Sequence, residues 1–236
     1  MSAVTDVAAS IVAAGAPLLF IDTCSLLDIV RGQRDAFTRD QAMAVVKIID
    51  LIEAGKLSLV LPEQITNELT DNFQEVQKDG TKSISALNDR VRQMHEIMMA
   101  FGGTGPAIAL PNPTDYTTLA DAIVARFLAK SIITDTTTTA THRAAQRVIT
   151  ATAPAASGKQ SYKDCLVLES CLEALSAVRS LGFSAGAYFL SSNIAEYGDA
   201  AKKTLHPQLV TEFAAHGLDF AKSFLELRYM PAIAAL

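Results

Sequence analysis

The chain has 236 residues, of which 50% are hydrophobic and 19% charged, and its formal net charge is -5. This length and apolar content are enough for one sizeable core, so we expect a single domain. The negative net charge excludes a basic field over the whole molecule, so any contact with a nucleic acid must be local.

No segment has the length of a membrane span. The longest apolar run, residues 11–21, is much shorter than the roughly 20 residues that cross a bilayer. A secretory signal needs a basic start, but the first basic residue is Arg31. The three cysteines form no CxxC pair and are interpreted as core residues in a reducing compartment. We therefore expect a soluble cytoplasmic protein without a membrane partner.

The chain opens with a strand and a helix. Residues 18–21 form a short apolar run, typical of a buried parallel strand, which delivers Asp22 at its C-terminal end. Thr38 and Gln41 have the spacing of a capping box, and apolar residues then recur at helical intervals until Gly55. The pattern predicts an amphipathic helix.

A second strand and helix follow. Residues 57–61 are the next apolar run, and Pro62 is expected as the first residue of a helix. Its buried stripe would be Ile65, Leu69, Phe73 and Val76. The order strand, helix, strand, helix indicates an α/β fold.

The middle of the chain is predicted to be helical. Apolar periodicity in 84–101, 119–133 and 140–151 indicates added helices. Residues 102–113 and 154–160 are rich in Gly, Pro and small residues, and these segments predict exposed loops.

The last third returns to the strand and helix pattern. Ser161 and Asp164 resemble a second capping box at the start of a helix. Residues 187–190 predict a third strand, and the tail, 206–229, predicts a helix, a break at Gly217 and a last strand or helix.

Four polar side chains are placed to meet at one edge of this sheet. Asp22 and Asn193 follow strands, Asp164 lies in the first turn of a helix, and Glu68 lies near the start of the second helix. Ligands bind outside the carboxyl ends of parallel strands, near the point where the strand order reverses. Carboxylates about 5 Å apart repel by roughly 3 kcal/mol per pair at an effective dielectric near 20, and a divalent cation would relieve this repulsion. Hard oxygen ligands favour Mg²⁺ or Mn²⁺, which can activate water against a phosphodiester.

The first two of these positions lie in stretches that resemble known motifs. Residues 20–27 (FIDTCSLL) are similar to the first motif of PIN-domain nucleases, in which an Asp ends the first strand, as Asp22 does here. Residues 61–69 (LPEQITNEL) resemble the second motif, with Glu68 in the place of the acidic residue.

The other two positions continue the resemblance in the same order. Residues 162–166 (YKDCL) resemble the third motif, with Asp164 as the central metal-binding Asp. Residues 189–193 (FLSSN) resemble the strand-end motif whose fourth polar position is Asp or Asn. Asn193 stands where Asp is often found, which leaves Glu196 or no acid for that role.

The resemblance implies an α/β fold with a doubly wound parallel sheet. Residues 1–236 would form a single PIN-like domain, with a helical insertion at about 84–152 between the second and third motifs. The implied activity is an Mg²⁺- or Mn²⁺-dependent endoribonuclease that leaves 5′-phosphate ends on RNA, in a toxin-type or RNA-processing role. The implied catalytic residues are Asp22, Glu68, Asp164 and Asn193, and the implied metal ligands are Asp22, Asp164, Glu68 and Glu196.

Basic residues near the motifs are candidates for phosphate contacts. These are Lys159 and Lys163, which lie close to Asp164, followed by Arg31, Arg34 and Arg39. The sequence leaves open an inhibitory protein partner and a homodimer, and it does not distinguish RNA from DNA.

Two other functions remain as alternatives. One is a non-catalytic PIN-like binding or scaffold protein, in which Asn193 has lowered the activity and the added helices bind a partner. The other is an aspartyl-phosphate phosphatase, which would also place an Asp at a strand end. Such a site of the DxD type needs a second acid, but Asp22 is followed by Thr23 and Cys24.

Overall fold

The structure of the protein is a computed structural model that describes residues 3–31, 37–106, 109–157, 161–199 and 204–236. Two predicted phosphate contacts, Arg34 and Lys159, lie outside the described residues.

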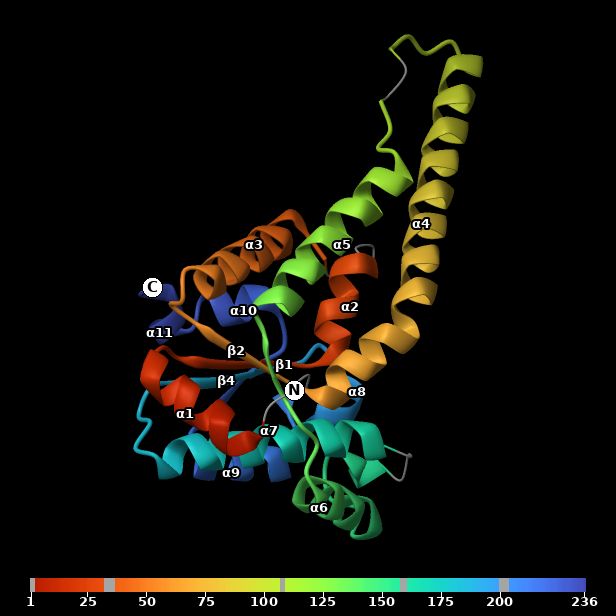
Figure 1. The fold of residues 1–236 in the computed structure, drawn as a ribbon. Helices are drawn as coiled ribbons and strands as arrows, with labels where there is room; N and C mark the ends of the chain where they lie inside the picture. Colours follow the sequence, from red (N-terminus) through yellow and green to blue (C-terminus); the bar gives the residue numbers. More distant parts are fainter. Residues whose placement is uncertain (1–2, 32–36, 107–108, 158–160, 200–203) are drawn as a thin grey trace.

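A five-stranded parallel sheet forms the centre of the fold (Figure 1). The strand order is β3-β2-β1-β4-β7, and all four neighbouring pairs are parallel. The bounds are β1 (Leu18–Ile21), β2 (Ser58–Pro62), β3 (Ile132–Thr134), β4 (Ala187–Leu190) and β7 (Leu218–Ala221). Every residue of β1 and β4 is buried, as expected for strands covered on both faces.

Helices cover both faces of the sheet, so the predicted doubly wound α/β fold is confirmed (Figure 1). One face carries α2 (Thr23–Arg31), α3 (Arg39–Glu53), α5 (Pro113–Lys130) and α10 (Phe224–Arg228). The opposite face carries α1 (Val4–Ala14), α7 (Tyr162–Ser180) and α9 (Pro207–His216), with α6 (Thr138–Ile149) packed on α7. The short elements are α8 (Ile194–Tyr197), β5 (Gly198–Asp199), β6 (Thr204–Leu205) and α11 (Pro231–Ala234).

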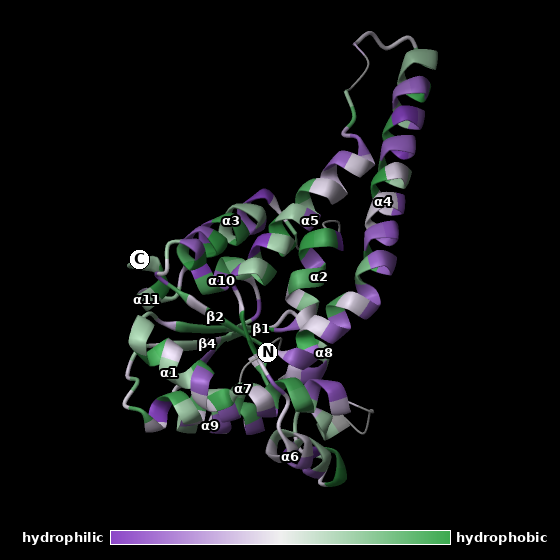
Figure 2. Cartoon of the chain, in the orientation of Figure 1, coloured by the Kyte–Doolittle hydropathy of each residue, from purple (hydrophilic) through white to green (hydrophobic). Residues whose placement is uncertain are grey.

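One helix, α4 (Glu63–Ala100), extends far beyond the body and forms an arm with the start of α5 beside it (Figure 1). The sequence predicted two separate helices here, and this prediction was wrong. Gly80 in the middle lets the helix pass close to α2, because a Cβ at this position would lie 2.9 Å from the carbonyl oxygen of Val30. Figure 2 shows hydrophobic residues concentrated on the sheet and mainly hydrophilic residues along α4.

Two other boundaries differ from the predictions. The helix predicted for 119–133 ends at Lys130, and Ile132–Thr134 form the edge strand β3, since three β-branched residues favour a strand when β2 is available as a partner. The segment predicted as helical insertion therefore also contributes to the sheet. Pro62 ends β2 and caps α4, and is not the first helical residue.

The remaining predicted helices and strands are present, whereas the exposed loop predicted at 154–160 begins with buried residues and a short 3-10 helix, Ala155–Ser157. The helix opened by Thr38 is α3, the strand predicted at 187–190 is β4, and the tail folds into α9 and β7 on either side of Gly217. Within the described part of the chain, no helix combines the length and the apolar character that crossing a bilayer requires.

Candidate active site

The site lies where the strand order of the sheet reverses. The chain builds β2 and β3 on one side of β1, then crosses to place β4 and β7 on the other side. Asp22 follows β1 and Asn193 lies three residues after the end of β4, so both occupy the carboxyl edge at this switch point. Parallel sheets bind ligands at this place because the loops on either side diverge and leave a crevice.

Asp22 is buried at the end of β1, with 3% of its surface exposed. Its backbone N–H donates to Leu190, and its Oδ2 accepts a hydrogen bond of 2.9 Å from the hydroxyl of Ser191. Burial, followed by the charges of Asp164 and Glu68, raises the pKa of Asp22 to about 7. Both of these charges are negative, so they add to the effect of burial on the Asp22 carboxylate.

Asp164 approaches the same point from the first turn of α7. The side-chain amide of Asn193 donates to its Oδ1 at 3.2 Å, and the hydroxyl of Tyr197 donates to its backbone oxygen. Burial, followed by the charges of Glu196 and Glu68, raises the pKa of Asp164 to about 6. From its position after β4, Asn193 therefore orients the Asp164 carboxylate through this hydrogen bond.

Glu68 is connected to Asp22 and Asp164 by its charge, and to α2 by a hydrogen bond. Its Oε2 accepts a hydrogen bond of 2.8 Å from Thr23, the residue after Asp22, and its Oε1 accepts one of 2.9 Å from Gln64. Because these donors fix both oxygens, Glu68 faces the start of α2 although it lies on a different helix.

Glu196 is linked to the start of α7 in a way that the sequence did not predict. The hydroxyl of Ser161 donates to Glu196 and makes no capping bond to its own helix, so the predicted capping box with Asp164 is wrong. The carboxylate in the first turn of α7 therefore lies among acids, without a role in a capping box.

The chemistry of these donors fits a hard divalent cation. Asp22, Glu68, Asp164 and Glu196 supply only oxygen ligands, and burial, followed by the charges of neighbouring acids, raises the pKa values of Asp22 and Asp164. Among the described residues, no three His, Cys, Asp or Glu side chains are placed so that they could hold a metal ion together, so the four predicted metal ligands do not form a ligand cage. Mg²⁺ does not need such a cage, because it usually keeps several waters and binds one or two carboxylates.

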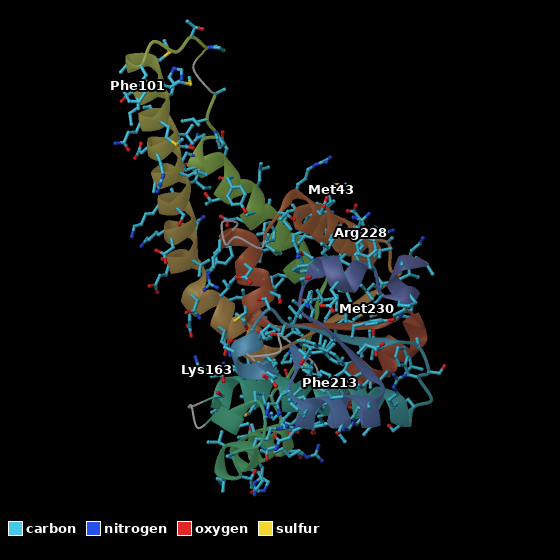
Figure 3. All side chains as sticks on the ribbon, turned by 180° about the vertical axis from the view of Figure 1, so that it is seen from behind. Met43, Phe101, Lys163, Phe213, Arg228 and Met230 are labelled. Carbon is cyan, nitrogen blue, oxygen red and sulfur yellow. The ribbon has the colours of Figure 1, made fainter. Side chains whose placement is uncertain are left out.

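The predicted basic residues are more scattered. Lys163 is exposed at the start of α7, at the edge of the body (Figure 3). Arg31 at the end of α2 donates to Asp28 at 3.3 Å, and Arg39 is exposed at the start of α3. Lys163 directly precedes Asp164 in the sequence, which makes it the described basic residue nearest in sequence to an acid of the site.

The structure adds polar residues that the sequence reasoning missed. Ser191 bonds to Asp22, Thr23 bonds to Glu68, and Ser192 donates to Asp28 at 2.6 Å. The available signal was the pair of serines directly after a predicted strand, since polar residues at that edge face the ligand crevice.

Fold and site together define an α/β protein with an acidic site at the switch point of a parallel sheet. A family model described as PIN domain matches residues 19–197, and the chain belongs to the PIN-domain family. The match begins in β1 and ends at α8, so it contains all four acidic residues, and the predicted resemblance is confirmed. PIN domains are generally nucleases that use divalent metals. No curated protein and no solved structure matches the chain.

Proposed function

We propose that this protein is an Mg²⁺- or Mn²⁺-dependent endoribonuclease. The observation that supports this function best is the pair of acids Asp22 and Asp164, which come from different elements and have raised pKa values. A fold keeps such a destabilising arrangement when a ligand compensates it, and a divalent cation with a phosphodiester substrate is the ligand that PIN-domain membership suggests.

In this proposal each polar residue has a part. Asp22 and Asp164 would hold the cation, with Glu68 and Glu196 as further acidic groups. When bound, the ion polarises the phosphodiester, lowers the pKa of an attacking water and stabilises the leaving 3′ oxygen. The hydroxyls of Ser191 and Thr23 restrict the orientation of the carboxylates that they contact. Asn193, being neutral, orients Asp164 without adding charge.

The products should carry 5′-phosphate ends, because the nucleophile is an activated water and not the 2′ hydroxyl of the substrate. Lys163, which directly precedes Asp164 in the sequence, is the proposed phosphate contact. RNA is proposed as the substrate because PIN-family membership suggests it.

The test is cleavage of end-labelled single-stranded RNA in Mg²⁺ or Mn²⁺ and in excess chelator. We expect cleavage with metal, none with chelator, and 5′-phosphate on the products. Asp164→Asn should lose activity, whereas the matched control Asp89→Asn should not, since Asp89 is an exposed residue on the arm. Full activity in chelator, or 2′,3′-cyclic phosphate ends, would contradict this mechanism.

The arm favours a second candidate function, binding without catalysis. Its far end exposes large apolar side chains, including Met94, which is 64% exposed. Phe101 at the tip is 87% exposed (Figure 3). Monomeric proteins rarely expose a cluster of large apolar side chains unless it binds a partner or a ligand. A melting temperature that does not respond to Mg²⁺ or Mn²⁺, together with no cleavage of any RNA, would favour this function over the nuclease.

A further inference from the structure

A cavity of about 400 Å³ lies next to the acidic site. It opens between residues that follow β4 and β7 and residues of α2 and α3, which places it at the same carboxyl edge of the sheet. Its apolar lining includes Phe37, Ile194 and Phe224, and its polar lining includes Asp28, Gln41 and Lys222. Small-molecule sites have this size and this mixture of apolar walls with a few polar groups.

The segment after β4 separates the cavity from the acids by a single layer of chain. Ser191 bonds to Asp22 and Asn193 bonds to Asp164, whereas Ser192 and Ile194 line the cavity. Residues of this segment therefore alternate, with one contacting the acidic site and the next lining the cavity. A ligand bound at the acids would therefore have the cavity on the other side of this segment.

The apolar lining suits a flat ring. Phe37 is half-buried before the start of α3, where its ring has a surface available to a ligand. Phe224 is buried and held against Phe127, with ring centroids 5.7 Å apart. Aromatic side chains stack on nucleobases of any sequence, because every base has a π face.

The polar lining suits the edge of a base. Asp28 accepts from Ser192 and Arg31, but a carboxylate has about four lone-pair sites and can accept further N–H donors. Gln41 uses its carbonyl oxygen to accept from the backbone of Leu225 at 3.1 Å, so its orientation is fixed and its NH₂ group can donate to a ligand.

Lys222 adds a positive charge at the rim. Its side chain takes part in none of the ion pairs formed among the described residues, and it is exposed. A lysine in this position favours a phosphate group outside the cavity.

We propose that this cavity binds one unstacked nucleobase of the nucleotide adjacent to the scissile phosphate. The base stacks on Phe37 and directs its N–H groups to Asp28, while Lys222 contacts the neighbouring phosphate. This inference rests on the proposed nuclease function. It also implies that the substrate is single-stranded at this position, because a base within a duplex cannot enter.

The test compares a single-stranded RNA that the protein cleaves with the same RNA carrying an abasic residue on either side of the scissile bond. Loss of one stacked base should lower kcat/KM by about 5- to 150-fold on one of the two sides. Phe37→Ala should lower kcat/KM by a similar factor on the intact RNA and cause no further loss on the sensitive abasic RNA. The control Ile149→Ala, which removes an exposed apolar side chain at the end of α6, should leave both values unchanged.

Two results would overturn the inference. One is equal cleavage of the intact RNA and both abasic RNAs, and the other is an equal loss from Phe37→Ala on intact and abasic RNA. If the protein cleaves no RNA, the nuclease proposal fails, and the cavity is then tested by fluorescence anisotropy with the same labelled RNAs. Tighter binding of intact RNA that disappears in Phe37→Ala would support the cavity as a base site, and equal binding of all RNAs would exclude it.

Discussion

The substitution Asp22→Asn tests the acidic site through stability, without knowledge of the substrate. The pKa of this buried side chain rises from 3.8 to about 7 on folding, so its charge opposes folding by at most about 4 kcal/mol near neutral pH. An amide removes the charge but adds N–H donors that need partners, which costs about 1 to 2 kcal/mol. We expect a net gain of about 2 kcal/mol for the metal-free protein, or about 4 to 8 °C in melting temperature.

The dependence on pH has a defined sign. Below about pH 4 the carboxyl group is protonated in both the folded and the unfolded states, so its charge makes no difference. Between about pH 4 and pH 7 the unfolded chain loses the proton while the folded protein keeps it, so the stability of the wild type falls as the pH rises. The advantage of Asp22→Asn should therefore grow over this range and stay constant above it.

The assay is thermal melting of the wild type and Asp22→Asn from pH 4.5 to pH 8, first in chelator and then in millimolar Mg²⁺ or Mn²⁺. Metal should stabilise the wild type by mass action and the variant much less. The control Asp89→Asn removes an exposed charge and should show neither effect. If the variant were less stable than the wild type in chelator and responded equally to metal, Asp22 would be a turn residue and not a metal ligand.

Three further predictions concern other parts of the molecule. Arg147→Met should cost about 3 to 5 kcal/mol in urea denaturation, because it leaves the buried Glu169 without the guanidinium that it contacts. Gly80→Ala should cost at least about 1 kcal/mol in the same assay despite the better helix propensity of Ala, since its Cβ would meet backbone of α2. Asp164→Asn should abolish RNA cleavage, whereas Asn193→Ala should reduce it less, because an amide only orients its neighbour.

Matched controls separate these effects from general damage. Arg126→Met breaks a more exposed ion-pair group on α5 and should cost less than about 1 kcal/mol. Gly105→Ala adds a Cβ in open space and should be close to neutral. Equal losses at Arg147 and Arg126, an unaffected Gly80→Ala, or an Asn193→Ala variant as inactive as Asp164→Asn would each contradict the corresponding argument.

Local signals in the sequence predicted most of the sheet. The strands β1, β2 and β4 are short apolar runs flanked by polar or turn residues, and Thr38 caps α3 as its spacing predicted. The edge strand β3 was missed because three residues next to a helical pattern carry little information until β2 provides hydrogen bonds. The continuous α4 was missed because the apolar stripe stops at Val76 and resumes only at Ile84, and Gly80 between them permits contact with α2.

The sequence also predicted which residues would follow the strands, but not how their side chains pair. Asp22 and Asn193 lie at the predicted edge because a strand ends before each of them. The predicted partner of Ser161 was wrong, because its hydroxyl donates to Glu196, which lies far along the chain. Gln41 likewise leaves its predicted capping role and binds the backbone of Leu225. Such long-range contacts depend on how the helices pack, which local spacing does not encode.

A crystal structure of the protein soaked in Mn²⁺ would show whether the acids at the switch point hold a cation. We expect an anomalous peak between the carboxylates of Asp22 and Asp164, with at least one oxygen of each about 2.0 to 2.2 Å from the ion, close to the distances of Mg²⁺. The peak should disappear in Asp22→Asn. A fully occupied ion elsewhere, or an empty site at saturating Mn²⁺ with both carboxylates still bonded to Ser191 and Asn193, would contradict the claim that this is a metal-dependent active site.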